Sequence, residues 1–433
     1  MWQPVTGEDL GQQVWRTIDD IEHRLIEDLG SGSRTWNPTL AGGDLGPVLF
    51  FAYLGAVRPD GGASERATEI LDRGIDALAE ADVDPFLYTG FCGIGWTLEH
   101  LSQELFSGED DLAAEVDAAL RGLLANSQRK PFELMRGISG LGVYLTERAP
   151  RPEAVELLSL VLDNLEATAE DTPLGLTWHT TSEWLPHWKR ATAPGGYYDL
   201  GLAHGIPGIL GFLAAARRTG IDDSRVTLLA EGTVRWLLSQ RLPGASDSAF
   251  PAFHIPGTAP SPTRLAWCYG DLGMAAVLLS AARAFDRSDW ETEAIALARL
   301  AADRSEKSAA AVDACLCHGT AGNALIFLRL YHATDDPLLK KAALAWIDRT
   351  LRIRRPGAEM AGFPNWVPGA TGEEGSWQPD AGFLMGISGI GLALLAAVSD
   401  VEPAWDRVML LSIPPRVECA SPIRAEPKGR SSS

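Results

Sequence analysis

The chain has 433 residues, 46% of them hydrophobic, which is enough apolar surface to bury a large core. It carries 37 basic and 57 acidic residues, and this formal net charge of -20 argues against nucleic acid or an anionic membrane surface as the main partner, because both attract basic faces. We find no apolar run long enough for a transmembrane helix and no targeting segment, and five cysteines do not suit a disulfide framework. We therefore expect a protein of the reducing cytoplasm that is not an integral membrane protein.

A motif of two glycines separated by two residues recurs seven times, and an apolar run follows each copy. The copies are spaced by 47 to 68 residues. The shortest spacing suits two helices of about 12–15 residues and two loops. The longer spacings predict insertions of roughly twenty residues after the third, fourth and sixth copies. The first glycines of the copies are Gly43, Gly90, Gly137, Gly205, Gly270, Gly319 and Gly386.

The apolar runs alternate with segments that carry a single apolar stripe, such as Val226, Leu229 and Leu237. A helix that is apolar on most faces is buried, whereas a striped helix covers it. The pattern predicts an all-α fold, an α/α toroid of fourteen helices in two concentric rings, as a single domain over residues 1–415. The polar segment 416–433 is expected to be a disordered tail. In such a toroid the loops before the inner helices gather at one end, so residues beside the glycines converge.

Cysteine and histidine side chains lie beside the glycines of neighbouring copies. Cys268 comes two residues before the first glycine of the fifth copy, and Cys317 and His318 come just before that of the sixth. Thiolates and imidazole select zinc, and three protein ligands leave its fourth tetrahedral position open. We expect these three side chains to bind one zinc ion at the mouth of the barrel. The alternative is that the cysteines are small buried apolar residues, and Cys315 competes with Cys317 as a ligand.

Three motifs resemble those of the LanC-type lanthipeptide cyclases: WCYG at 267–270, CHG at 317–319 and LGLAHGIPG at 200–208. The resemblance implies a toroid with zinc at one end. It also implies the reaction, in which a cysteine thiol of a dehydrated precursor peptide adds to dehydroalanine or dehydrobutyrine and forms a lanthionine or methyllanthionine thioether. A separate dehydratase, a membrane exporter and peripheral association with their complex are implied as partners.

The addition leaves an enolate, which needs a proton from a general acid. His204 is the first candidate for this acid, and the alternative is a structural cap of an inner helix. Tyr269 would hold the enolate oxygen or position a thiol, or it is a packed aromatic residue. Arg264 matches an arginine of the resembled family and would stabilise the enolate, or it is a surface residue. Glu133 replaces the family's usual aspartate and would orient His204 or act as a base, whereas Asp199, where an amide is common, receives no catalytic role.

Aromatic residues gather in two insertions, where they either form a rim for an extended peptide or fasten the insertions to the barrel. Two other functions are weighed. A binding or regulatory protein would use the zinc to hold a thiol such as glutathione, but it would need no proton donor. A glycosidase would need two opposed carboxylates, and the seven turns offer no obvious pair. The aromatic residues are Trp178, Trp184, Trp188, Tyr197 and Tyr198 in 178–198, and Phe363, Trp366 and Trp377 in 362–379.

Overall fold

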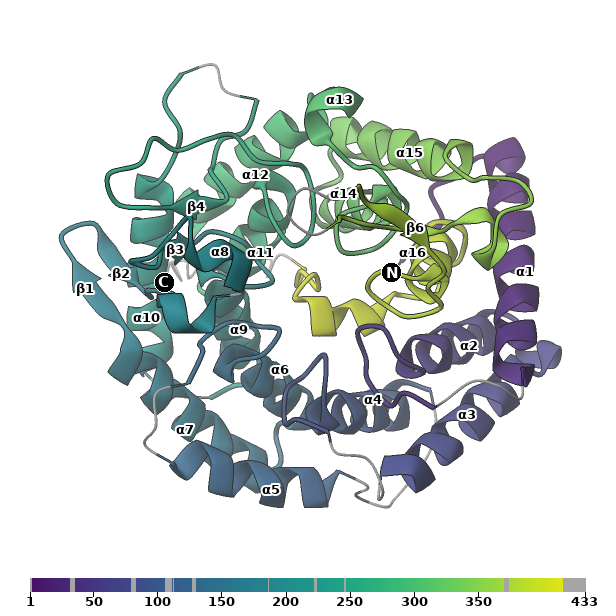
Figure 1. Cartoon of the computed structure of the whole chain (residues 1–433), viewed down its shortest axis with the longest axis horizontal. Helices are drawn as coiled ribbons and strands as arrows, with labels where there is room; N and C mark the ends of the chain where they lie inside the picture. The colour runs from purple at the N-terminus through teal and green to yellow at the C-terminus, as the bar shows by residue number, and fades with distance from the viewer. Residues whose placement is uncertain are drawn as a thin grey trace, which may run out of the picture.

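In the part of the chain that the computed structural model describes, fourteen long helices form two concentric rings (Figure 1), as the repeat predicts. The expected disordered tail, 416–433, lies outside the residues that the structure describes. The described residues are 2–31, 36–78, 83–105, 111, 113–126, 130–185, 187–221, 224–244, 247–369 and 374–415.

The inner ring consists of seven helices, one after each glycine motif, and each contacts the next around a closed circle. These helices are buried on nearly every face because outer helices cover one side and the centre of the ring is filled. In α11, for example, every residue from Asp271 to Ala282 is buried. The inner helices are α2 (Leu45–Val57), α4 (Phe91–Glu104), α6 (Ile138–Arg148), α9 (Ile206–Arg218), α11 (Asp271–Ala284), α14 (Thr320–Thr334) and α16 (Ile387–Val398).

The outer ring consists of the striped helices, and its closure departs from seven successive hairpins. The last inner helix, α16, packs against α1 at the start of the chain, so the first and last helices of the ring form its seventh pair. Helix α1 buries Val14, Ile18 and Ile21 along one stripe. The glycine motif could not mark this helix, because the motif precedes inner helices only. The outer helices are α1 (Glu8–Gly30), α3 (Ala63–Leu78), α5 (Ala114–Ala125), α7 (Pro152–Thr168), α10 (Ser224–Ser239), α12 (Ser288–Ala302) and α15 (Pro337–Arg352).

A short 3₁₀ helix, η4 (Ala404–Met409), lies within the ring (Figure 1, yellow). Its backbone accepts hydrogen bonds from two side chains of the turns that precede inner helices: Tyr88 Oη donates to the Val408 carbonyl and Trp267 Nε1 donates to the Met409 carbonyl, both at 2.9 Å. Its Asp406 is fully buried and accepts two hydrogen bonds from Arg329 of α14, at 2.6 and 2.9 Å. This segment therefore completes the core at the centre of the ring.

Arg329→Met is expected to destabilise the fold by about 3–5 kcal/mol, because it leaves the buried Asp406 carboxylate without its charge partner. The measurement is the free energy of unfolding in urea. The matched control is Arg352→Met on the outer helix α15, whose ion pair with Asp348 leaves 56% of each side chain exposed. That variant should lose less than about 1 kcal/mol. Equal losses in the two variants would contradict the assigned role of Arg329.

The predicted insertions are present after the third, fourth and sixth inner helices, and they contain all the strands of the described residues. Three short antiparallel pairs form there: β1 with β2, β3 with β4, and β5 with β6. The β3–β4 pair joins the first two insertions to each other. The strands are β1 (Glu170–Thr172), β2 (Gly175–Thr177), β3 (Tyr198–Asp199), β4 (Phe253–His254), β5 (Asn365–Val367) and β6 (Ser376–Gln378). The remaining short helices are η1 (Pro59–Gly61), η2 (Ser182–Trp184), α8 (His187–Arg190), α13 (Glu306–Ala309) and η3 (Met360–Gly362).

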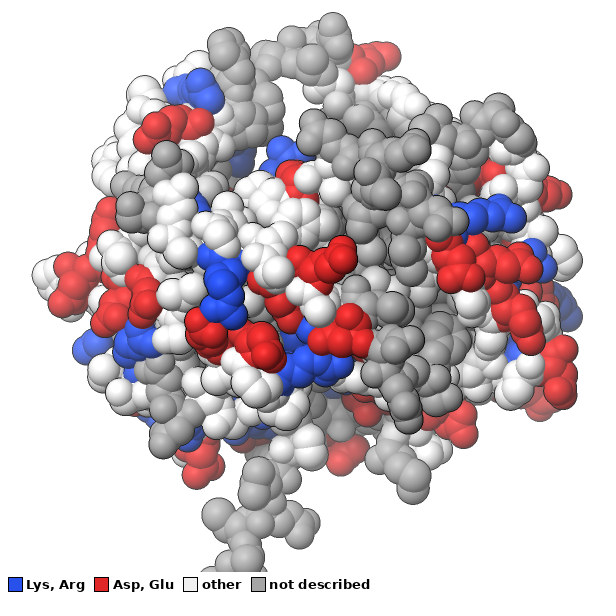
Figure 2. All heavy atoms as spheres, turned by 90° about the horizontal axis from the view of Figure 1, so that it is seen from below, with Lys and Arg blue, Asp and Glu red and all other residues white. Residues whose placement is uncertain are grey.

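Acidic and basic side chains are interspersed on the side of the molecule in Figure 2, and the described residues show no broad basic patch in that view. This face therefore offers no continuous basic surface to a phosphate backbone. None of the helices in the described part of the chain is both long enough and apolar enough to span a membrane.

Candidate metal centre and active site

Backbone hydrogen bonds connect the turns that precede the inner helices. In several turns the residue two positions before the first glycine donates its N–H to the carbonyl of the equivalent residue in a neighbouring turn. These turns therefore meet at one end of the barrel, as the repeat predicts, and the two cysteines occupy equivalent positions. The bonds run from Ala203 to Cys268 (3.4 Å), Cys268 to Cys317 (3.2 Å), Cys317 to Leu384 (3.0 Å) and Leu384 to Ala41 (2.8 Å).

The glycines allow these turns to close tightly. Gly319 directly precedes α14 and lies so close to the backbone of Cys315 that a β-carbon would overlap it. Gly270 directly precedes α11 and has a φ of 111°, a conformation that other residues rarely adopt. Each glycine follows a candidate ligand directly or by one residue, so the turn geometry fixes the direction of the cysteine side chains.

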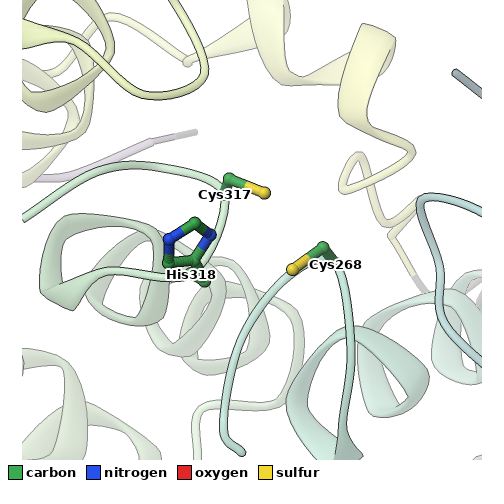
Figure 3. Close-up of side chains that lie close together, drawn as sticks. All are labelled: Cys268, Cys317 and His318. Atoms are coloured by element: carbon green, nitrogen blue, oxygen red, sulfur yellow. The ribbon is translucent and has the colours of Figure 1, made fainter. Parts of the chain in front are cut away.

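Cys268, Cys317 and His318 form a cluster that could hold a metal ion. One ligand atom from each lies within 4.8 Å of the others, and the side chains face a common space from the turns before α11 and α14 (Figure 3). Two thiols and one imidazole fit zinc better than harder divalent metals, and a three-ligand set leaves a position for a substrate atom. The chemistry of the donors therefore supports the predicted zinc site.

A second group shares His318 and includes Asp313 and Cys315, with ligand atoms that also lie within 4.8 Å of one another. Cys315 is fully buried, its Sγ accepts the N–H of His318 at 3.4 Å, and burial holds the pKa of its thiol well above the usual value. Asp313 is likewise engaged, because its two carboxylate oxygens accept backbone N–H groups of Cys315 and Trp366, both at 3.2 Å. These bonds favour a supporting role for the second group and leave Cys317 as the better ligand.

The two cysteines of the cluster differ in acidity. A hydrogen bond with the Cys317 thiol, helped by the positive charges of His318 and Arg264, holds the pKa of Cys268 well below its usual value although burial opposes this. The same hydrogen bond and burial hold the pKa of Cys317 well above its usual value. One thiolate is thus stabilised by the protein, and a divalent cation would favour deprotonation of the other.

Asp313 also lies behind His318, with its Oδ2 3.9 Å from the histidine Nε2. A carboxylate that is hydrogen-bonded to a metal-binding imidazole orients the ring and increases its basicity; because 3.9 Å is longer than a hydrogen bond, this role for Asp313 is a prediction. Asp313→Asn is expected to weaken zinc binding about 10–100-fold, as measured by competition with a chromogenic chelator. Asp84→Asn serves as the control, because Asp84 makes the same kind of turn in the second repeat. Unchanged affinity in Asp313→Asn would contradict the role of Asp313.

His204 and Glu133 are brought together by neighbouring turns although they are 71 positions apart in the sequence, with Nδ1 2.7 Å from Glu133 Oε2. The longer glutamate side chain folds back on its own turn, where it accepts the N–H groups of Met135 (3.0 Å) and Arg136. Its carboxylate thereby reaches the histidine despite the extra methylene. His204 keeps 49% of its side chain exposed, so its ring is accessible from the mouth.

The environment of His204 raises its pKa. Burial by the surrounding loops lowers the pKa, but the hydrogen bond to Glu133 and the negative charges of Glu133, Asp199 and Cys268 outweigh burial. A raised pKa keeps the imidazole protonated nearer to neutral pH, which suits a general acid. The Cys268 contribution also places His204 within electrostatic reach of the metal cluster.

Tyr269, directly after Cys268, donates its hydroxyl to Asp199 Oδ2 at 2.9 Å. Asp199 is 1% exposed, and burial raises its pKa to about 6. Burial and the neighbouring carboxylate hold the pKa of Tyr269 well above its usual value. The sequence alone assigns no catalytic role to Asp199. Its spacing is a signal that could have indicated a structural role, because an aspartate also lies six residues before the first glycine in three other copies, at Asp84, Asp313 and Asp380.

Arg264 has an exposed side chain and no hydrogen-bond partner among the described residues. Its charge nevertheless lowers the pKa of both Cys268 and Cys317. The guanidinium therefore lies near the metal cluster with its donors free, in a position to meet an anionic group at the mouth. Its contact with an enolate stays a prediction.

Most of the aromatic residues in the insertions fasten these segments to the barrel. Trp178 is fully buried and donates Nε1 to the Leu165 carbonyl at 2.9 Å, and Phe363 is also buried in the barrel core. Tyr197 is buried too, but in a separate small cluster that joins the first two insertions to each other. Trp366 and Trp377 pair across the β5–β6 hairpin, with ring centroids 5.0 Å apart, and are only half-buried. These two are the better candidates for a peptide contact, whereas the side chain of Trp188 lies outside the described part of the chain.

Similarity to known proteins extends over most of the chain. The family model described as Lanthionine synthetase C-like protein matches residues 34–410. A relative, Glutathione S-transferase LANCL1 of Danio rerio, is 26% identical over 382 residues, which are 82% of this chain and 86% of the relative. The structure of Nisin cyclase superposes with a TM-score of 0.73 at 18% identity, over 94% of this chain and 98% of that chain. The structure of Cellobiose 2-Epimerase from Bacillus thermoamylovorans B4167 has a TM-score of 0.50 at 12% identity, over 90% of this chain and 99% of that chain. The architecture alone therefore does not specify the reaction.

Proposed function

Since the chain belongs to the lanthionine synthetase C-like family, we propose that it is a zinc-dependent cyclase. In this proposal a cysteine thiol of a dehydrated precursor peptide adds to the β-carbon of a dehydroalanine or dehydrobutyrine residue of the same peptide, and a thioether ring results. The observation that carries the proposal is the convergence of the Cys268–Cys317–His318 cluster with the His204–Glu133 pair at one end of the barrel.

Cys268, Cys317 and His318 would hold the zinc ion. Zinc in this position supplies Lewis acidity that keeps a substrate thiol deprotonated at neutral pH, whereas a free thiol has a pKa of about 8.5. The two cysteine thiolates add negative charge beside the substrate sulfur, and this charge keeps that sulfur nucleophilic. Asp313 accepts the backbone N–H of Cys315, which fixes the turn, and it would orient His318 from its position 3.9 Å away.

His204 supplies the proton that completes the addition. When the carbon–sulfur bond forms, the electron pair of the double bond moves to the α-carbon and its neighbouring carbonyl, and the resulting enolate takes a proton at the α-carbon from the imidazolium. Glu133 keeps the imidazole protonated and oriented through Nδ1, so Nε2 is the nitrogen available to the substrate. Arg264 would stabilise the enolate oxygen by charge.

The test mixes the purified protein with a dehydrated peptide that contains cysteine, and it counts free thiols by alkylation and mass spectrometry. Cyclisation consumes one thiol per ring and leaves the peptide mass unchanged. The expected result is loss of thiols with the wild type and not with a heat-inactivated sample. Persistent thiols with zinc-loaded wild-type protein would refute the cyclase.

A second candidate function is suggested by the name of the relative from Danio rerio, Glutathione S-transferase LANCL1. In this alternative the thiol held at the metal centre is glutathione, either for transfer to an electrophile or for binding and regulation alone. The same assay with glutathione added separates the two functions, because addition of glutathione increases the peptide mass and ring closure does not.

The proposed setting of the cyclase is a biosynthetic complex at the cytoplasmic side of a membrane. A separate dehydratase would supply the dehydrated peptide, and an exporter would remove the product. Co-purification of the chain with a tagged dehydratase in the presence of the precursor peptide tests this association.

A further inference from the structure

In four of the turns, an aspartate lies six residues before the first glycine and makes the same kind of hydrogen bond. In each turn it accepts the N–H of the residue two positions later, which shapes the loop before the inner helix. The second carboxylate oxygen is not required for this task. The four donor–acceptor pairs are Phe86 to Asp84 (2.9 Å), Gly201 to Asp199 (2.7 Å), Cys315 to Asp313 (3.2 Å) and Gly382 to Asp380 (2.7 Å).

Asp199 uses its second oxygen differently from Asp84. In Asp84 the Oδ2 atom accepts the hydroxyl of Thr89 at 2.7 Å, within the same turn. In Asp199 the Oδ2 atom accepts the hydroxyl of Tyr269 at 2.9 Å, in the turn of the next repeat. The bond therefore connects the turn that carries His204 with the turn that carries the metal ligand Cys268.

This hydrogen bond determines which role the Tyr269 hydroxyl has, because it uses the hydroxyl as a donor. An ionised carboxylate accepts hydrogen bonds and donates none, and the pKa of Asp199, about 6, leaves it ionised at neutral pH. The single hydroxyl hydrogen of Tyr269 is thus committed to Asp199. No residue in the described part of the chain donates to the tyrosine oxygen, so its lone pairs remain available.

The tyrosine ring is held in place from several sides. It packs on Gly201, where a β-carbon would overlap the ring, and it meets Phe253 edge-on at 5.4 Å between centroids. The ring is half-buried and lies 6.4 Å from the ring of His204, centroid to centroid. Its oxygen therefore has a fixed position beside the candidate general acid.

We propose that Tyr269, with its proton held by Asp199, accepts a hydrogen bond from an N–H group of the bound peptide and so positions the substrate, rather than donating a proton to the enolate. A backbone N–H near the reacting cysteine is the donor that such a peptide offers. Asp199 acts through Tyr269 and is a positioning residue. The inference rests on the proposed function, because it assigns a peptide to the metal centre.

Asp199→Asn tests the proposal because it reverses the polarity with almost no change of shape. The amide oxygen can still accept the Gly201 N–H and keep the turn. The amide nitrogen then donates to the tyrosine oxygen, so the hydroxyl hydrogen is free to point toward the substrate. Tyr269→Phe removes the oxygen altogether. Asp84→Asn controls for the change in the turn. Tyr198→Phe controls for the loss of a tyrosine–carboxylate hydrogen bond, because the Tyr198 hydroxyl donates to Glu170 at a distance of 2.8 Å.

The expected result is a rise in KM of about three- to tenfold in Asp199→Asn and Tyr269→Phe, with kcat nearly unchanged, which is the scale of one lost neutral hydrogen bond. The double variant should match Tyr269→Phe, and the two controls should match the wild type. A fall in kcat for Tyr269→Phe at unchanged KM, together with normal or faster turnover in Asp199→Asn, would overturn the proposal, since a proton donor to the enolate behaves in that way.

Two readouts do not depend on turnover. The first is calorimetric binding of a cysteine peptide that carries alanine in place of dehydroalanine, for which the same losses are expected. If these losses occur in a protein that does not cyclise peptides, the proposed function fails and this inference stands; if cyclisation occurs but all variants bind alike, only this inference fails. The second is the infrared C–O stretch of Tyr269, isolated as the difference between wild type and Tyr269→Phe. It should report a phenol that donates in the wild type and one that accepts in Asp199→Asn, and an identical band in both would overturn the proposal.

Discussion

Cys268→Ala is expected to leave the purified protein without stoichiometric zinc and to reduce cyclisation by more than about 100-fold. Loss of an outer partner of a metal ligand already costs about 10–100-fold, and loss of the ligand itself should cost more. Cys268 contributes one of three side chains in the cluster and the thiol that the protein itself makes acidic. Metal content by plasma emission spectrometry and thiol counting on the dehydrated peptide measure the two effects.

Three further cysteine variants make this result specific. Cys92 is fully buried in α4, away from the cluster, and Cys92→Ala should keep both zinc and activity. Cys317→Ala should behave as Cys268→Ala does, whereas Cys315→Ala should retain the metal. The reverse pattern, zinc lost in Cys315→Ala and kept in Cys317→Ala, would assign the metal to Asp313, Cys315 and His318 instead. Thermal melting of each variant separates loss of metal from loss of the fold.

The metal cluster was accessible to sequence reasoning because it depends on repetition. The equal offset of Cys268 and Cys317 from their glycines implies equivalent turns, and a closed ring of repeats brings equivalent turns together. The backbone bond from the Cys268 N–H to the Cys317 carbonyl, at 3.2 Å, is the physical form of that equivalence. The inner helices were predictable for the same reason, since each follows the first glycine of a motif and contains an apolar run.

Features that depend on single contacts could not be predicted in this way. Helix α1 precedes the first glycine motif, and its packing against α16 follows only from closure of the ring. Segment η4 has no periodicity, and a buried ion pair between Asp406 and Arg329 holds it. The partnership of Asp199 with Tyr269 was missed because the direction of a hydroxyl across two repeats leaves no pattern in the chain.

His204→Asn is expected to lower kcat by about 10²–10⁴-fold, the usual contribution of general acid catalysis, while binding of the substrate thiol persists. The pH dependence then tests the source of the acidity. A general acid works in its protonated form, so the rate is full below the pKa of His204 and falls as pH rises through it. Because Glu133 raises that pKa, the alkaline limb of the wild-type profile should lie above the ordinary value for histidine.

Glu133→Gln removes the largest contribution that raises the pKa of His204, so only the charges of Asp199 and Cys268 oppose the effect of burial. The alkaline limb of kcat against pH should therefore move to lower pH in Glu133→Gln, and Glu133→Asp should restore part of the shift if the shorter carboxylate reaches Nδ1. His254→Asn is the matched control, because His254 lies on β4 and makes no contact with Glu133 among the described residues. An alkaline limb that stays in place in Glu133→Gln would mean that a group other than His204 donates the proton. A shifted limb with zinc content unchanged would instead tie proton delivery to the Glu133 carboxylate, which reaches His204 from the neighbouring repeat.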